Sequence, residues 1–231
     1  MGLGGATWLD VAAWQGACVV ALPIGSLEQH GPHLPLDTDT RIAVELARRL
    51  SATRTDVVVA PPVSYGASGE HAGFAGTLLV NHAVLAEILL ELIRSARASF
   101  SGVVLISAHG GNHEALASVG ERCRVDGEKA VIWSAAVPGG DAHAGRTETS
   151  LMLAIDPGVV RMELAEAGCT DPLDALMPRL RAEGVRPVSS NGVLGDPRGA
   201  SAAEGELLLA AMIDDLVATL HASVPYAGQW A

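Results

Sequence analysis

Residues 22–40 read LPIGSLEQHGPHLPLDTDT, and they overlap the apolar run ACVVALPIG at residues 17–25. The run predicts a short buried strand, because it is brief and continuous and because Gly25 and Ser26 end it. The loop after it holds five side chains of the kinds that bind zinc, manganese or iron(II), namely Glu28, His30, His33, Asp37 and Asp39. Loops at the carboxyl ends of parallel strands are where α/β proteins bind their ligands. We therefore expect a metal site at the end of this strand.

The spacing within this loop favours a metal site over a purely structural role. Glu28 and His30 are two residues apart, so an extended backbone projects both side chains to the same side. The alternative is a polar loop that caps a helix, because RIAVELARRL at residues 41–50 has helical periodicity and Asp39 or Thr40 suits its N-cap. Capping explains one acidic residue and leaves Glu28 and His30 without a role.

Apolar runs and helical patterns alternate along the rest of the chain. Strands are predicted at residues 56–66, at the start of 102–120 and at 129–137, and helices at 81–100, after the Gly turn in 102–120 and near the C-terminal end. Such alternation is typical of an α/β protein with a parallel sheet covered on both faces. With 231 residues and no linker or repeat, the chain is predicted to form one domain, residues 1–231.

Composition and charge exclude several classes of protein. The net charge of −11 argues against a nucleic-acid partner, which requires a basic face. No run approaches the roughly 18 apolar residues of a membrane span, and the first ten residues lack the features of a signal peptide. These two features predict a cytoplasmic protein. Cys18, Cys123 and Cys169 lie far apart without CxxC spacing, which indicates reduced thiols and no disulfide framework.

A second group of polar residues, SAHGGNHE at residues 107–114, lies where a strand becomes a helix. A phosphate-binding turn is one interpretation, but the GxGxxG and GxxxxGK[ST] patterns are absent. A lone histidine here is more often structural. His109 nevertheless leaves the same predicted sheet edge as Glu28 and His30, which favours a role at the same metal site.

Two further stretches carry candidate chemistry. In DAHAGRTETS at residues 141–150, His143 suits general acid–base catalysis because imidazole titrates near neutral pH. Glu148 is either a ligand or simply an acid in the first turn of a helix. Glu70 and His71, in a Gly-rich loop, either line a substrate pocket or cap the next segment. No GxSxG motif suggests a serine nucleophile.

Together with SYGASGEHAGFAGT at 64–77 and GVLGDPRGASAAEGE at 192–206, these motifs resemble the creatininase family of metal-dependent amidohydrolases, over roughly residues 20–210. The resemblance implies a three-layer αβα sandwich with a mostly parallel sheet and a site for two divalent metal ions, Zn, Fe(II) or Mn. It also implies a homo-oligomer, such as a hexamer.

The same resemblance assigns roles to individual residues. Glu28, Asp39 and His109 would hold one ion, and His30 and Asp39 the second, with Asp39 bridging the two. Creatininase has a glutamate at the position of Gly111, so Glu148 is expected to supply that carboxylate here. His143 would act as a proton shuttle.

Within the family, size and motifs most resemble members that trim the C-terminal end of a modified ribosomal precursor peptide during redox-cofactor biosynthesis. The expected substrate is therefore a peptide or another small amide. The alternative is a hydrolase of a small cyclic amide or formamide, creatinine-like or pyrimidine-derived. Creatininase places tryptophans over its substrate, whereas Trp133 here lies in a predicted strand. A metal-binding structural subunit without turnover is a third, non-enzymatic interpretation.

Overall fold

The computed structural model describes residues 2–224; residues 1 and 225–231, which the single-domain prediction also covers, lie outside the described part. At its centre is a four-stranded parallel sheet with the order β2-β1-β3-β4. The strands are β1 (Val19–Ile24), β2 (Val57–Val59), β3 (Gly102–Ser107) and β4 (Ala130–Ser134). All six residues of β1 and of β3 are buried, which explains why these strands read as continuous apolar runs.

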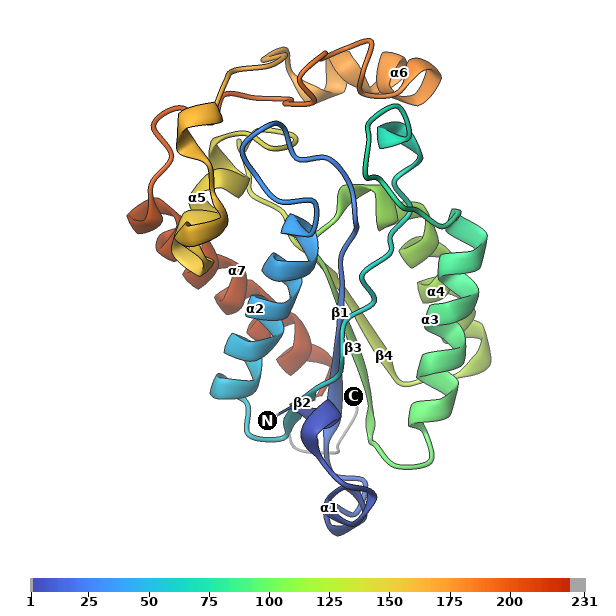
Figure 1. The fold of residues 1–231 in the computed structure, drawn as a ribbon. Helices are drawn as coiled ribbons and strands as arrows, with labels where there is room; N and C mark the ends of the chain where they lie inside the picture. The colour runs from blue at the N-terminus through green and yellow to red at the C-terminus, as the bar shows by residue number, and fades with distance from the viewer. Residues whose placement is uncertain (1, 225–231) are drawn as a thin grey trace.

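Helices cover both faces of this sheet (Figure 1). One layer consists of α2 (Thr38–Thr53), α5 (Arg146–Ile155) and α7 (Ala202–Ser223), and the other of α3 (His82–Ala96) and α4 (His113–Asp126). Alternate residues of β1 serve the two layers: Val19 and Ala21 belong to one core cluster and Val20 and Leu22 to the other. The predicted three-layer αβα sandwich is confirmed.

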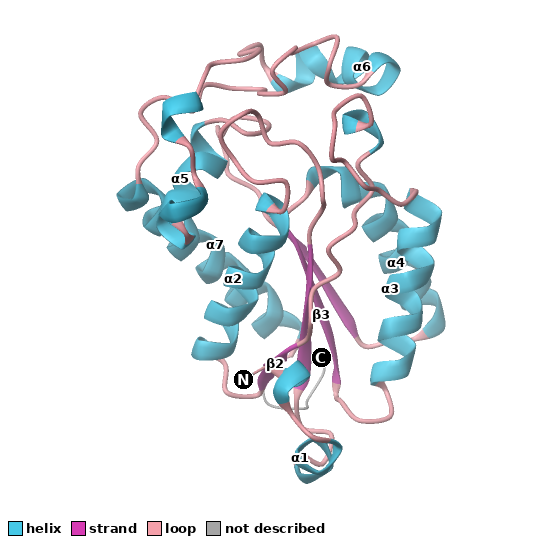
Figure 2. Ribbon diagram, in the orientation of Figure 1, coloured by secondary structure: helices cyan, strands magenta, loops and turns pink. Residues whose placement is uncertain are grey.

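The remaining elements are short. They are η1 (Leu3–Gly5), α1 (Trp8–Ala13), η2 (Gly69–His71), η3 (Gly110–Asn112), η4 (Pro157–Val159), η5 (Met162–Leu164) and α6 (Leu173–Glu183). The loops at the carboxyl ends of the strands, and the segment that contains α6, lie together at one end of the molecule, away from α1 (Figure 2). Among the helices of residues 2–224, none combines the length and the apolar character of a membrane-spanning segment.

The start of α2 differs from the sequence-based interpretation. Neither Asp39 nor Thr40 is the N-cap; Asp37 holds that position, and its side chain makes no capping bond. Thr40 instead donates a hydrogen bond from Oγ1 to the carbonyl of Ser26, at 3.1 Å. A Cβ on Gly25 would overlap the backbone of Thr40, so glycine lets α2 begin directly against the end of β1. This contact presents Asp39 to the loop that follows β1.

Candidate metal centre

The candidate ligands meet at the carboxyl edge of the sheet, although they come from distant parts of the chain. Glu28 and His30 lie in the loop after β1, Asp39 in the first turn of α2, His109 just after β3 and Glu148 in the first turn of α5. Glu28 and His30 are fully buried, and Asp39 is 1% exposed. Buried charges persist only where they are paired or bind metals.

Glu28, Asp39 and His109 form the first group, with one ligand atom from each within 4.8 Å of the others. Nε2 of His109 lies 3.3 Å from Oε2 of Glu28, and its Nδ1 lies 3.1 Å from Oδ2 of Asp39. Ligand atoms about 2 Å from a shared ion are themselves roughly 3 to 4 Å apart. One ring nitrogen of His109 can bind an ion at a time, and one ligand atom from each of the three residues lies close enough to share an ion, the grouping that the resemblance predicts.

His30, His143 and Glu148 form the second group. Nε2 of His30 lies 3.2 Å from Oδ1 of Asp39 and 3.9 Å from Oε2 of Glu148. Asp39 thus turns one oxygen to His30 and the other to His109, as a bridging carboxylate must. Nδ1 of His30 lies 3.1 Å from the carbonyl oxygen of Glu28, which can only accept a hydrogen bond. This contact places a ring proton on Nδ1, so Nε2 is the nitrogen that would bind a cation once the cation displaces its proton.

Glu148 lies in the helix turn that the sequence predicts, and its role as a ligand stays a prediction. It lies in the first turn of α5, and its Oε2 accepts a hydrogen bond from the backbone N–H of Ala144 at 2.6 Å. A Cβ on Gly111 would overlap the carbonyl oxygen of Ala67 and the ring of His109. This backbone has no room for a side chain at position 111, and Glu148 lies near His30; its role as the replacing ligand stays a prediction.

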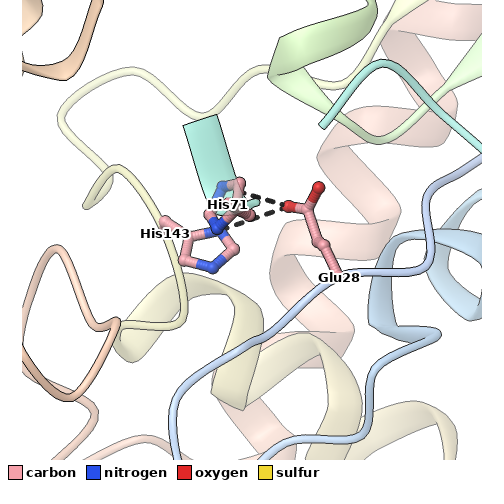
Figure 3. Close-up of side chains that lie close together, drawn as sticks. All are labelled: Glu28, His71 and His143. Carbon is pink, nitrogen blue, oxygen red and sulfur yellow. Dashed lines mark ion pairs between the residues drawn. The ribbon is translucent and has the colours of Figure 1, made fainter. Parts of the chain in front are cut away.

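A third group consists of Glu28, His71 and His143 (Figure 3). Nε2 of His71 lies 3.4 Å and Nδ1 of His143 lies 3.8 Å from Oε1 of Glu28, and the two imidazole centroids are 4.4 Å apart. His71, predicted to line the substrate pocket, is buried at 3% exposure, whereas Glu70 beside it is half-buried. Their roles as pocket residues stay predictions.

The carboxylates of the cluster differ in charge. Burial raises the pKa of Glu28 to about 7, against the opposing effect of His109, and burial also raises the pKa of Glu148 to about 7. Burial acts in the same sense on Asp39, but His30 and His109 outweigh it and hold the pKa of Asp39 well below its usual range. Both carboxylate oxygens of Glu28 are buried and accept no hydrogen bond from the described residues. An orphaned buried carboxylate of this kind fits a cation site.

The imidazoles fall into two pairs. Burial disfavours charged His30 and His109, but the neighbouring carboxylates outweigh this effect and raise the pKa of each to about 10. Burial lowers the pKa of His71 to about 3 and that of His143 well below its ordinary value, so both are neutral. A divalent ion bound among the carboxylates would displace the protons from His30 and His109.

Two side chains of the loop lie outside these groups. Nε2 of His33 lies 2.9 Å from Oγ1 of Thr149, and Asp37 accepts a hydrogen bond from Nε of Arg41 at 2.7 Å. Sequence reasoning also missed Gln29, which is buried between two predicted ligands and touches both His71 and His143. The sequence offered one signal for Gln29: it is a polar residue whose two neighbours, Glu28 and His30, are both candidate ligands.

A three-layer αβα fold with a buried cluster of carboxylates and imidazoles at its carboxyl edge is that of an α/β protein with a candidate metal centre. The family model described as "Creatininase: Creatinine amidohydrolase" matches residues 5–220. The chain therefore belongs to the creatininase family, and the predicted family is confirmed.

Relatives and solved structures give the same picture. The chain is 50% identical to a protein of Mycolicibacterium smegmatis named "Mycofactocin precursor peptide peptidase", over 85% of this chain and 81% of that protein. It is 28% identical to the creatinine amidohydrolase of Pseudomonas putida, over 96% of this chain and 97% of that protein. A solved structure of a mutant creatininase of the Zn-Zn type superimposes with a TM-score of 0.80 at 26% identity, covering 97% of this chain and 98% of that one.

Proposed function

We propose that this protein is a metal-dependent peptidase that trims the C-terminal end of the modified mycofactocin precursor peptide during redox-cofactor biosynthesis. The observation that carries the proposal is the 50% identity to the relative named for that activity, against 28% to creatinine amidohydrolase. A peptide bond and the ring amide of creatinine present the same reacting group, so a single family site suits both kinds of substrate.

The proposed centre holds two divalent ions, Zn, Fe(II) or Mn. Glu28, Asp39 and His109 would hold one ion, and His30, Asp39 and Glu148 the other. The unpartnered oxygens of Glu28 and the Nε2 atom that His30 turns toward Asp39 support this assignment. When bound, such ions polarise a carbonyl group and lower the pKa of a water molecule from about 15.7 toward about 7.

His143 is the proposed catalytic acid–base residue. Its depressed pKa keeps the imidazole neutral near pH 7, so that it can accept a proton from the attacking water. The imidazolium formed then donates that proton to the departing amine, because an amide nitrogen leaves readily only when it is protonated. The side chain is 9% exposed, which limits competition from bulk water.

The second candidate is hydrolysis of a small cyclic amide or formamide, which the 28% identity to creatinine amidohydrolase supports. Trp133 argues against creatinine itself. Its ring lies in β4 at 5% exposure and donates from Nε1 to Asp215 at 2.7 Å, so it is not free to stack on a ligand.

Direct incubation separates the candidates. The metal-loaded protein, with and without a chelator, is mixed with the modified precursor peptide, with the unmodified peptide and with creatinine, and the products are followed by mass spectrometry. Chelator-sensitive release of a C-terminal fragment supports the proposal. Turnover of creatinine alone, or cleavage that survives complete metal removal, contradicts it.

The proposed assembly is a cytoplasmic homo-oligomer, such as a hexamer. Val84, Ile88 and Leu92 lie four residues apart on α3 and are 40–45% exposed, and an apolar stripe of this kind suits a contact with a second copy. The free thiols of the three cysteines fit a reducing compartment. Light scattering coupled to size-exclusion chromatography tests the assembly, and a monomeric mass contradicts it.

A further inference from the structure

The side-chain amide of Gln29 is held in one orientation by the backbone at both of its ends. Its Oε1 accepts a hydrogen bond from the N–H of Gly31 at 2.8 Å, and its Nε2 donates to the carbonyl of Gly192 at 3.0 Å. An N–H group only donates and a carbonyl only accepts, so the amide cannot be turned over. Gly192 has φ +83°, and a Cβ there would overlap the Gln29 amide, so a glycine makes room for it.

The backbone carbonyl of Gln29 decides where His143 carries its proton. Nε2 of His143 lies 2.8 Å from this oxygen, which can only accept, so Nε2 is protonated. Nδ1 is then unprotonated and faces Oε1 of Glu28 at 3.8 Å. Because Nε2 of His143 is a donor, its 3.0 Å contact with the amide nitrogen of Gln29 is not a hydrogen bond.

The second amide hydrogen of Gln29 is therefore left for His71. Nδ1 of His71 lies 2.9 Å from Nε2 of Gln29 and accepts this hydrogen. The ring proton of His71 is consequently on Nε2, which faces Oε1 of Glu28 at 3.4 Å (Figure 3). Neither oxygen of Glu28 accepts a hydrogen bond from the described residues. His71 thus turns an N–H group, and not a lone pair, toward Glu28, at an ion-pair distance that is longer than a hydrogen bond.

We propose that Gln29 is a positioning residue that sets the proton positions of two histidines: its side chain directs the N–H of His71 at Glu28, and its carbonyl leaves Nδ1 of His143 free. This inference rests on the proposed function. Nδ1 is then the atom of His143 that takes the proton from water and returns it to the leaving amine. The bond from Nε2–H to the Gln29 carbonyl stabilises the imidazolium in between, as the third member of a catalytic triad does.

His71 accordingly turns its ring N–H to Glu28. An outer hydrogen-bond partner of a metal ligand typically contributes 10- to 100-fold to metal affinity or activity. The same logic excludes the Glu28, His71 and His143 group as a third metal site, because only two of its three members present a lone pair.

The test is nitrogen NMR of the full-length, zinc-loaded protein labelled with ¹⁵N in its histidine rings. The variants His71→Asn and His143→Asn assign the two rings by loss of their signals. We expect both rings to be protonated on Nε2 and unprotonated on Nδ1. In Gln29→Glu a carboxylate oxygen replaces the donor, so the proton of His71 moves to Nδ1, while His143 keeps its pattern because the backbone carbonyl is unchanged.

Kinetics and controls complete the experiment. In Gln29→Glu, kcat should fall by roughly 10- to 100-fold, whereas Gln15→Glu, the same change at an exposed residue near α1, should alter neither spectrum nor rate. If Gln29→Glu does not fold, Gln29→Met replaces it, and His71 should then show a mixture of both tautomers. Wild-type His71 protonated on Nδ1, or a His71 pattern unchanged in the variants, overturns the inference. If the NMR spectra are as expected but the protein cleaves no peptide, the proposed function is refuted and the positioning role of Gln29 is not.

Discussion

Asp39→Asn is the substitution that most sharply separates a shared metal ligand from a structural carboxylate. Asp39 contacts both imidazole groups, at 3.2 Å from Nε2 of His30 and 3.1 Å from Nδ1 of His109. The amide keeps the shape of the side chain but removes its charge and one of its two ligand oxygens. Outer partners of metal ligands contribute 10- to 100-fold to affinity, so loss of a ligand shared by both ions should weaken each by more than about 100-fold.

Asp37→Asn provides the matched control in the same loop. The side chain of Asp37 is 38% exposed and pairs with Arg41 at 2.7 Å, an interaction of about 0–1 kcal/mol. It contacts neither group, so this variant should keep both ions. Metal content is measured by mass spectrometry after dialysis, and affinity by competition with a chromophoric zinc chelator. Two ions per chain in Asp39→Asn, bound within tenfold of the wild-type affinity, would refute the bridging role.

Three further predictions concern the rate, the pH dependence and the core. His143→Ala should keep its metal but lower kcat by roughly 10²–10⁴-fold, and wild-type turnover would remove it from the mechanism. His30 and His109 have pKa values raised to about 10, so the metal-free protein should lose stability in urea as pH rises from about 7 to about 10, and an unchanged or rising stability would contradict this. Leu46→Ala, at a fully buried site in α2, should cost about 2–5 kcal/mol of unfolding free energy by denaturant titration. Leu207→Ala, at 73% exposure, should stay within about 0.5 kcal/mol, and equal effects would contradict the assigned core.

The layered architecture could be predicted because the apolar residues of a strand show directly that the strand is buried on both faces. β1 and β3 are apolar throughout, and the helices between strands show clear periodicity, which together indicate a covered parallel sheet. The meeting of Glu28, Asp39 and His109 also followed from order along the chain, because carboxyl ends of parallel strands share one edge. Their role as ligands stays a prediction, as does the single domain.

The rest depends on contacts between distant residues. His33 and Asp37 were both candidate ligands in the loop. In the structure His33 contacts the hydroxyl of Thr149, and Asp37 accepts a hydrogen bond from Arg41. The role of Gln29 depends on Gly192, which lies 163 positions away. The helix cap was misassigned because α2 begins at Thr38, before residue 41, where the helical pattern of apolar residues becomes visible in the sequence.

Anomalous X-ray diffraction at the zinc edge, on crystals of the zinc-loaded protein, would show directly whether two ions share Asp39. We expect two strong peaks on either side of the Asp39 carboxylate, one beside Glu28 and His109 and the other beside His30 and Glu148. A single peak, a peak held by His71, or no peak within this cluster would contradict this expectation.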